Sequence, residues 1–338
     1  MQVGKDVYYD VKVSQVTPLT LIFFHRHGIG SVALADLPPD LQKRFGYDPT
    51  KAMADAVRRQ KEDDARKLSG TVAGTGANGP AATHSQEILR HFGETPKIFA
   101  QVNMRPRFDV LGIGTKDQTP HPSCAIFSLL SVYAFQRAPT TGLAPVFSEE
   151  YMIWAIMKVL SKNELAVPKD ASANLDLGFT LPQAAEALRG YGTAFAEEVP
   201  YHFSISDPHV YAPPTEVIDL ARKRSPSDGF FISGKDGKEK VANVIQVINA
   251  GVPVALTLNW PEQKEFGDNV MLDAQPADGK SQHVVVLVGY QTKSGKLDDL
   301  QFLFKNSYGV TWGDHGYGLL NYNYLVANFQ NALFLDVE

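Results

Sequence analysis

Hydrophobic and polar residues alternate in three short runs near the start of the 338-residue chain. Residues 7–13 (VYYDVKV), 19–26 (LTLIFFHR) and 31–37 (SVALADL) are rich in β-branched and aromatic residues, and turn residues separate them. Alternation of this kind is typical of short strands. We therefore predict a small β-rich module over residues 1–46.

The next segment differs in composition. Residues 47–68 are highly charged, and Asp48 and Pro49 stand where helices often begin. Residues 69–85 consist mainly of Gly, Ala, Thr and Ser and show no hydrophobic period, which is typical of a flexible linker. We predict a charged helix and a linker over residues 47–84, and a main domain over residues 85–338.

In the main domain, helical patterns come first and strand patterns follow. Helices are predicted at 124–135, 148–160 and 180–191, the last ending at Gly192. Apolar or alternating runs predict strands at 252–258, 283–290, 300–307, 317–323 and 332–337. Helices followed by mostly antiparallel strands, without alternating βαβ units, indicate an α+β fold. A site is expected in a cleft between the two halves.

Charge and hydropathy exclude several classes of protein. The net charge is −5 with scattered Lys and Arg, so the basic stripe of a nucleic-acid binder is absent. The longest apolar runs, 19–24 and 284–288, are far shorter than the roughly 20 residues of a membrane-spanning helix. The chain as given has no signal peptide. A single cysteine leaves the compartment open: we expect export if a leader precedes the natural chain, and a cytoplasmic protein otherwise.

The single cysteine, Cys124, lies in the segment QTPHPSCAIF at 118–127. Pro122 favours an extended approach, Ser123 is a suitable N-cap, and the residues that follow are apolar on all faces. Cys124 is therefore expected in the first turn of a buried helix, where free N–H groups and the helix dipole lower the pKa of a thiol. An inert buried cysteine is the alternative, unless a base lies within reach.

Among the nine histidines, His283 stands out because it begins the apolar run 283–290. If this strand pairs antiparallel with 300–307, a turn centred near residues 294 and 295 places Asn306 opposite His283. Directly opposed side chains share one face of a sheet. A thiol, an imidazole and an amide are the parts of a cysteine nucleophile, its base and the group that orients the base. Gln118, six residues before the cysteine, is a candidate donor to an oxyanion.

These residues together resemble the papain-like cysteine peptidases. The segment KNSYGVTWGDHGYG at 305–318 is the most specific match, similar to the family's Asn-Ser-aromatic-Gly segment with a later Trp and Gly-Tyr. SCAIFSLLSVY resembles the family's nucleophile helix and HVVVLVGY its histidine strand. The resemblance runs from about residue 96 to the C-terminus and implies a two-lobed papain-like fold, with a helical lobe and an antiparallel β lobe.

The resemblance implies a role for each matched position. Cys124 becomes the nucleophile, His283 the general base and then acid, Asn306 the residue that orients His283, and Gln118 an oxyanion donor. The residues expected to contact substrate are Gly178, Phe179, Tyr308 and Trp312.

Three positions depart from the family pattern. Ala125 stands where the family usually has Trp, Tyr308 replaces a Trp that shields the His–Asn hydrogen bond, and Leu177 replaces a glycine of the cleft. These departures bear on substrate fit more than on catalysis. With no disulfides, the chain is closer to divergent bacterial members of the family.

The function expected from the resemblance is hydrolysis of peptide bonds in a peptide or protein substrate. Two alternatives remain open, namely an inactive homologue that binds peptides and an acyl transferase that uses the same thioester chemistry. Residues 1–95 differ from the family's inhibitory propeptide, and they form either an accessory module that binds a partner or surface, or a segment that covers the cleft. No motif predicts a cofactor or a metal, because the Gly-rich stretches lack a phosphate-binding context and HRH at 25–27 lacks further ligands.

Overall fold

The computed structural model describes most of the chain. The described residues are 2–3, 6–7, 9, 11–16, 20–25, 28–51, 83–119, 121–139, 142–162, 178–201, 210, 212–225, 228–261, 270–273 and 277–337. Most of the predicted charged helix and the predicted linker up to residue 82 lie outside them, as does Leu177.

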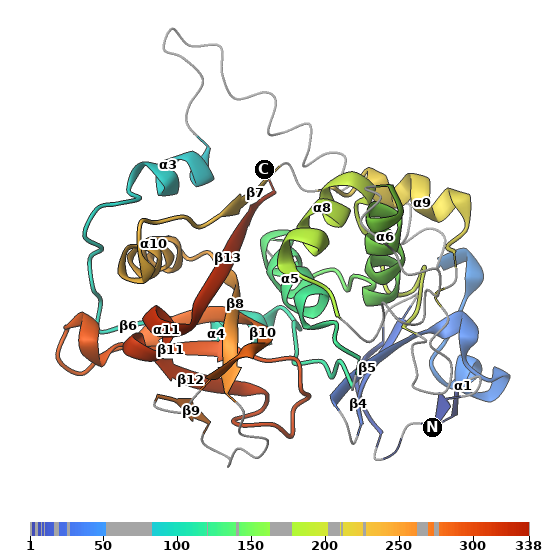
Figure 1. Ribbon diagram of the computed structural model, residues 1–338. Helices are drawn as coiled ribbons and strands as arrows, with labels where there is room; N and C mark the ends of the chain where they lie inside the picture. The colour runs from blue at the N-terminus through green and yellow to red at the C-terminus, as the bar shows by residue number, and fades with distance from the viewer. Residues whose placement is uncertain are drawn as a thin grey trace, which may run out of the picture.

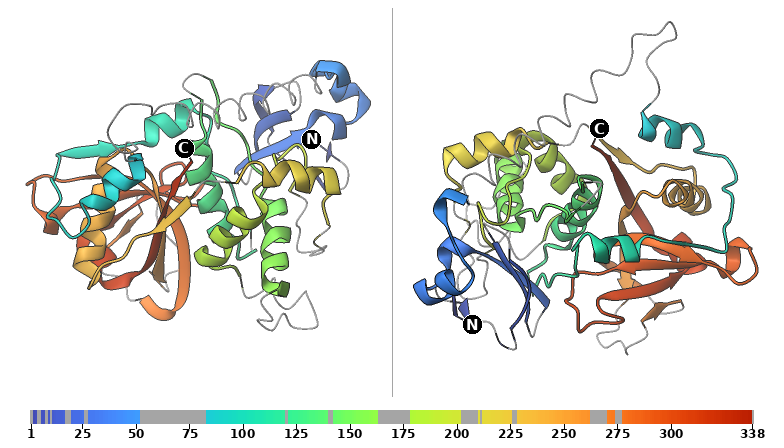
Figure 2. Two further views of the ribbon diagram at one scale, coloured as in Figure 1. Left: turned by 90° about the horizontal axis from the view of Figure 1, so that it is seen from above. Right: turned by 180° about the vertical axis from the view of Figure 1, so that it is seen from behind.

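The N-terminal segment contains a three-stranded antiparallel sheet in the order β3-β4-β5. Its elements, with those around it, are β1 (Gln2–Val3), β2 (Asp6–Val7), β3 (Lys12–Val16), β4 (Thr20–His25), β5 (Gly28–Ala33), the 3-10 helix η1 (Leu34–Asp36) and α1 (Pro39–Arg44). Leu21, Leu34 and Leu37 form a small core of their own. Figures 1 and 2 place these elements beside α9 and away from β7 and β13.

Helices dominate the first part of the main domain. They are α3 (His84–Arg90), α4 (Arg105–Val110), α5 (Cys124–Gln136), α6 (Glu149–Lys162), α8 (Leu181–Tyr191) and α9 (Thr215–Arg222). Eleven of the residues of α5 are buried, since the helix packs against α6 and α8 on one side and against β8, β10 and β13 on the other. The predicted buried helix at 124–135 is therefore confirmed, and its first residue is Cys124.

The second part of the chain forms an eight-stranded sheet in the order β7-β13-β8-β10-β11-β12-β9, with β6 paired to one end of β10. Its strands are β6 (Gln101–Asn103), β7 (Asp228–Phe231), β8 (Val254–Pro261), β9 (Met271–Leu272), β10 (Ala277–Gln291), β11 (Gln301–Lys305), β12 (Tyr317–Asn321) and β13 (Phe329–Asp336). All pairs are antiparallel except β12 with β9.

Figure 1 shows the helices α6, α8 and α9 on one side of the molecule, the sheet on the other, and α5 between them. The α+β, two-lobed architecture predicted from the sequence is confirmed. Two helices of the sheet lobe were not predicted, α10 (Gly237–Asn249) and α11 (Tyr322–Asn328), and a 3-10 helix, η2 (Leu297–Asp299), lies in the β10–β11 connection.

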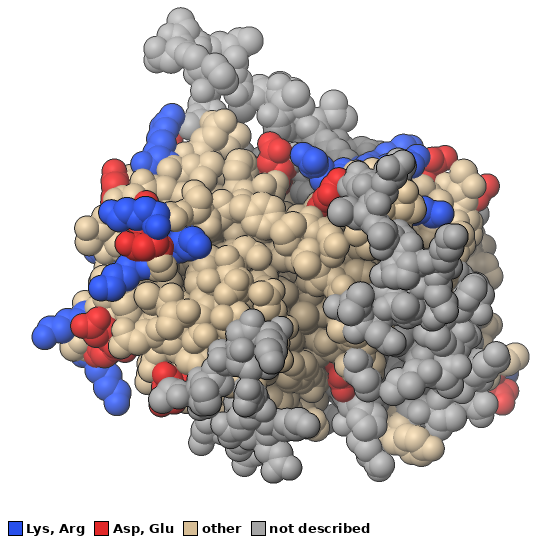
Figure 3. All heavy atoms as spheres, in the orientation of Figure 1, with Lys and Arg blue, Asp and Glu red and all other residues tan. Residues whose placement is uncertain are grey.

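Charged residues of both signs are mixed on the described surface. Figure 3 shows small groups that contain both signs at the edges of this face and a broad area without charge over its centre. None of the described helices is long and apolar enough to cross a membrane.

Candidate active site

Cys124 begins α5, and the loop before it is tightly packed. Ser123 occupies the N-cap position, as predicted, but its hydroxyl caps no helical N–H and lies instead 3.4 Å from the carbonyl oxygen of His121. Ser123 is fully buried and Cys124 is 9% exposed. The thiol is therefore held at the N-terminus of a buried helix, at the edge of solvent access.

The first two turns of α5 lie against β10 next to His283. Ser128 Oγ donates a hydrogen bond to the carbonyl oxygen of Val284 at 3.0 Å. Burial raises the pKa of the Cys124 thiol, while the backbone N–H groups of Val284, Ala125 and Cys124 itself act in the opposite direction. The N–H and the carbonyl oxygen of Val284 therefore both contact α5. Because His283 directly precedes Val284, it lies next to the nucleophile helix.

The imidazole of His283 is held by Asn306. His283 Nε2 lies 2.7 Å from Asn306 Oδ1, and the backbone N–H of Ser307 donates to the same oxygen at 2.8 Å. Since a backbone N–H can only donate, the Asn306 atom facing it is the oxygen, and His283 Nε2 must carry the proton. The neutral ring then presents Nδ1 as its acceptor.

The predicted register between these two residues is wrong by two positions. His283 lies inside β10, which begins at Ala277, and Val286 pairs with Lys305, so Asn306 is not directly opposite His283. The connection contains η2, and β10 itself has a bulge between Leu287 and Gly289, so the pairing differs from that of a simple hairpin. An even shift leaves both side chains on one face, which is why the hydrogen bond still forms.

Two aromatic rings enclose the His283 imidazole. The ring of Tyr308 lies 4.6 Å from it, centroid to centroid, and the ring of Trp260 lies 4.5 Å from it at 64°. The Tyr308 hydroxyl is 3.4 Å from His283 Nδ1. Trp312 contacts Trp260 and Tyr308 in turn. Tyr308 and Trp312, predicted to contact substrate, therefore lie on the histidine side of the site.

Trp260 was not singled out in the sequence. The signal was its position two residues beyond the predicted strand 252–258, because residues two apart share a face. The structure pairs Leu258 with His283, so Trp260 falls on the same side of the sheet as the imidazole.

Burial lowers the pKa of His283 to about 4, although the hydrogen bond to Asn306 opposes this effect. Together with the raised pKa of the Cys124 thiol, this favours a neutral thiol and a neutral imidazole in the free protein.

Gln118 is fixed between the active-site loop and the Asn306 segment. Its Nε2 donates to the carbonyl oxygen of His121 at 2.8 Å, and its Oε1 accepts from Ser307 Oγ at 2.6 Å. Its backbone N–H donates to the carbonyl of Ser307 at 2.9 Å. An amide nitrogen has two hydrogens, so one remains for a ligand.

Gly178 and Phe179 lie against the loop that precedes Cys124. The backbone N–H of Phe179 donates to the carbonyl of Pro122 at 3.3 Å, and its ring lies 5.9 Å from that of the buried His121. Gly178 has a φ of +77°, and a Cβ there would come within 2.9 Å of Pro122. Glycine is therefore required for this close approach.

The sequence comparison agrees with this geometry. Residues 221–332 match the sequence model of the papain family of cysteine proteases. Over this segment, the chain is similar to the papain family. The matched segment contains His283 and Asn306, whereas Cys124 and Gln118 lie before it, so their place in the site rests on the contacts described above.

Solved structures of papain-like proteases share the fold. Xylellain, a cysteine protease from Xylella fastidiosa, has a TM-score of 0.56 at 17% identity, over 74% of this chain and 92% of that one. A structure from the comparison of the mite allergens Blo t 1 and Der p 1 has a TM-score of 0.50 at 16% identity, over 77% and 75%. No curated protein matches the sequence. The predicted resemblance to papain-like cysteine peptidases, which are hydrolases, is confirmed, and a bacterial origin stays a prediction.

Proposed function

We propose that this papain-like chain hydrolyses peptide bonds with Cys124 as nucleophile and His283 as its proton acceptor and donor. The observation that supports this most is the 2.7 Å hydrogen bond between His283 Nε2 and Asn306 Oδ1. It leaves Nδ1 as the acceptor on a strand that packs against the helix of Cys124. A neutral imidazole with one free acceptor is the form that a general base requires.

In the proposed reaction, Cys124 Sγ transfers its proton to His283 Nδ1 and attacks the peptide carbonyl carbon. The tetrahedral intermediate then breaks its C–N bond, and the amine leaves with the proton from His283. A water molecule next gives a proton to His283 while its oxygen attacks the thioester. Cleavage of the C–S bond releases the acid and returns the proton to the sulfur.

Gln118 and the backbone N–H of Cys124 are the proposed donors to the oxyanion. Gln118 suits this role because its three hydrogen bonds to His121 and Ser307 hold the amide in place before substrate arrives. A preorganised donor stabilises the transition state without a cost of reorganisation.

Substrate backbone is proposed to bind along Gly178 and Phe179, which border the active-site loop. The absence of a Cβ at Gly178 lets the chain pass close to Pro122. Tyr308 and Trp312 are proposed to contact substrate from the opposite side, at the edge of the aromatic group that holds His283.

A panel of peptide substrates tests the proposal. The wild-type protein is expected to cleave part of the panel, and Cys124→Ala and Cys124→Ser are expected to fall to background. Ser161→Ala, at the exposed end of α6, serves as a matched control and keeps full activity. Undiminished turnover by Cys124→Ala would contradict the assignment of the nucleophile, and a wild type that binds peptides without cleaving them would support an inactive homologue.

Acyl transfer is separated from hydrolysis by the fate of the thioester. Hydrolysis predicts free carboxylic acids in the mass spectrum of the products, even when amines are added in excess. If the amount of amide product increases with amine concentration while the amount of acid falls, the protein is a transferase.

For the N-terminal residues we propose an accessory module rather than an inhibitory segment. The sheet of β3, β4 and β5 has its own small core around Leu21 and Leu34, as a separate module needs. Exposed Val13 and Val16 on β3 offer apolar surface to a partner. A chain that begins at residue 83 is expected to be as active as the full chain, and a clear gain in activity on truncation would favour inhibition.

A further inference from the structure

A cavity lies beside the proposed catalytic residues, and neither Cys124 nor His283 lines it. Its walls come mainly from α5, from the loop before α6, and from the segment Lys305–Ser307 at the end of β11. Its volume is about 60 Å³. Since one buried water takes up roughly 10–15 Å³ of such a cavity, there is room for a small molecule of about four to six non-hydrogen atoms.

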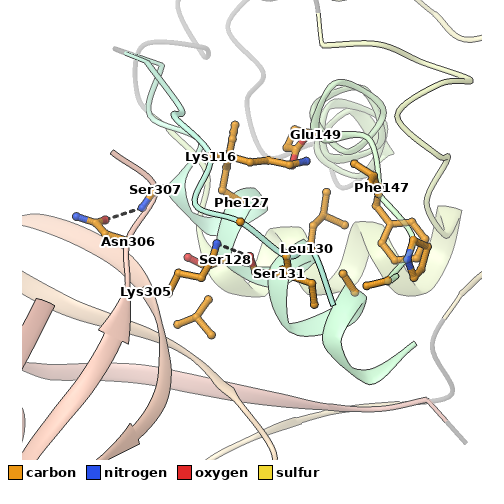
Figure 4. Close-up of a pocket in the computed structure, with 18 residues that line it drawn as sticks. Lys116, Phe127, Ser128, Leu130, Ser131, Phe147, Glu149, Lys305, Asn306 and Ser307 are labelled. Atoms are coloured by element: carbon orange, nitrogen blue, oxygen red, sulfur yellow. Dashed lines mark hydrogen bonds and ion pairs between the residues drawn. The ribbon is translucent and has the colours of Figure 1, made fainter. Parts of the chain in front are cut away.

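A buried cation reaches into this cavity. Lys305 is only 4% exposed, and its Nζ is 3.0 Å from Ser131 Oγ, a neutral partner. Figure 4 shows Lys305 and Ser131 joined across the cavity, with Phe127 and Leu130 close by. Among the residues that the structure describes, no carboxylate forms an ion pair with Lys305. A buried ammonium without an anion is costly, because nothing replaces the water it has lost.

Glu149, an acidic side chain in the cavity wall, is already engaged. Lys116 Nζ lies 2.6 Å from Glu149 Oε1 at the far side of the cavity, and Glu149 is buried. Burial lowers the pKa of Lys305 to about 7, the positive charge of Lys116 lowers it further, and Glu149 and Asp109 oppose these effects. Within the described part of the chain, Lys305 therefore has no directly paired carboxylate, and a bound anion would neutralise its charge.

Much of the remaining wall is apolar. Its apolar residues include Ile113, Leu130, Ala134, Val146, Phe147 and Val286. One cation and one hydroxyl next to apolar walls suit a ligand with a single negative charge at one end and a short hydrocarbon at the other. A dianion such as phosphate would leave one of its charges uncompensated in this setting.

We propose that this cavity is a binding site for a short-chain monocarboxylate of two to four carbons, with its carboxylate on Lys305 and Ser131 and its alkyl end against Leu130, Ala134 and Phe147. The ammonium of Lys305 and the hydroxyl of Ser131 donate to the carboxylate oxygens, and the charge-assisted bond is the stronger of the two. The site is separate from the proposed peptidase chemistry, although Asn306 and Ser307 form part of its wall.

The test compares butyrate with butyramide, which has the same shape without the charge. The thermal midpoint of the full chain is measured at pH 6 against increasing sodium butyrate, with sodium chloride keeping ionic strength constant. Butyrate is expected to raise the midpoint in a saturable way, because a ligand that binds only the folded state stabilises it, and butyramide is expected to have no effect.

Two variants and one control locate the effect. Lys305→Met removes the cation, and Ala134→Leu fills the cavity but keeps Lys305. Each variant is expected to raise the apparent Kd for butyrate at least tenfold. Lys293→Met, in the exposed turn after β10, removes one positive charge elsewhere and is expected to respond as wild type does. If Lys305→Met does not fold, the butyrate titration of Ala134→Leu provides the test. A wild type that ignores butyrate, or a folded variant that responds as wild type does, would overturn the proposal. The measurement needs no peptidase activity, so it stands or falls independently of the proposed function.

Discussion

The Tyr308 hydroxyl lies 3.4 Å from His283 Nδ1, the ring nitrogen that the hydrogen bond to Asn306 leaves as an acceptor. In the proposed reaction the same nitrogen receives the proton of Cys124. The hydroxyl and the thiol therefore compete for one acceptor. A hydrogen bond donated to Nδ1 stabilises the neutral ring and so lowers its basicity.

Tyr308→Phe removes this competitor and keeps a ring packed against His283. The pKa of His283 is expected to rise, because the neutral imidazole loses a donor while burial is unchanged. His283 must be neutral to act as a base, so the acidic limb of the pH profile of kcat/KM should move to higher pH. Profiles of the wild type and the variant, measured from pH 3 to 8 on one peptide, check this, and identical acidic limbs would show that the hydroxyl has no influence on Nδ1.

Asn306→Ala removes the acceptor that orients His283. Hydrogen bonds that involve a charged group contribute about 1.5–3 kcal/mol, and the bonded ring becomes an imidazolium during the reaction. We therefore expect kcat/KM to fall by roughly 10- to 150-fold. In a His283→Ala background the same change should cost almost nothing more, and equal losses in both backgrounds would mean that Asn306 acts without His283.

Gln118→Ala removes the proposed side-chain donor to the oxyanion. Loss of one such donor typically lowers kcat by about 10²–10³-fold. We expect a fall of this size with little change in KM, because the donor acts mainly in the transition state. Gln136→Ala, at the other end of α5, is the control and should be as active as wild type. A loss confined to KM would place Gln118 in substrate binding instead.

Lys305→Met is expected to stabilise the fold, and more so at low pH. The pKa of Lys305 is lowered to about 7 in the folded protein from 10.5, so the unfolded chain binds more protons between these values. The stability of wild type should rise with pH over this range. Each pKa unit corresponds to about 1.4 kcal/mol, so the advantage of the variant should be several kcal/mol at pH 6 and shrink towards pH 10. Urea unfolding at both pH values checks this, and a pH-independent difference would contradict it.

Periodicity alone predicted the elements that carry the site. The all-apolar pattern after Ser123 identified α5, and the run 283–290 identified the second half of β10. The register was missed because it depends on the connection, which contains η2, and on the bulge in β10 between Leu287 and Gly289. Asn306 still reached His283 because the error was even.

Other features depend on packing between distant segments. Trp260 meets His283 only through the pairing of β8 with β10, and Lys305 is buried only because α5 and the loop before α6 close over it. No local pattern marks either residue. α10 is different, since Asp236 caps its first turn and its apolar positions recur with a helical period, so its signal was present in the sequence.

The most direct test of the account is the reactivity of the single cysteine. Because Cys124 is the only thiol, one intact-mass spectrum reports its modification without digestion. The probe is a peptide with an electrophilic carbon at its C-terminal end, used at pH 6. It should add once to the folded wild type, much faster than to the urea-unfolded chain. The His283→Ala variant should react no faster when folded than when unfolded. A folded wild type that reacts no faster than the unfolded chain, or a His283→Ala protein that reacts as fast as wild type, would contradict a nucleophile activated by His283.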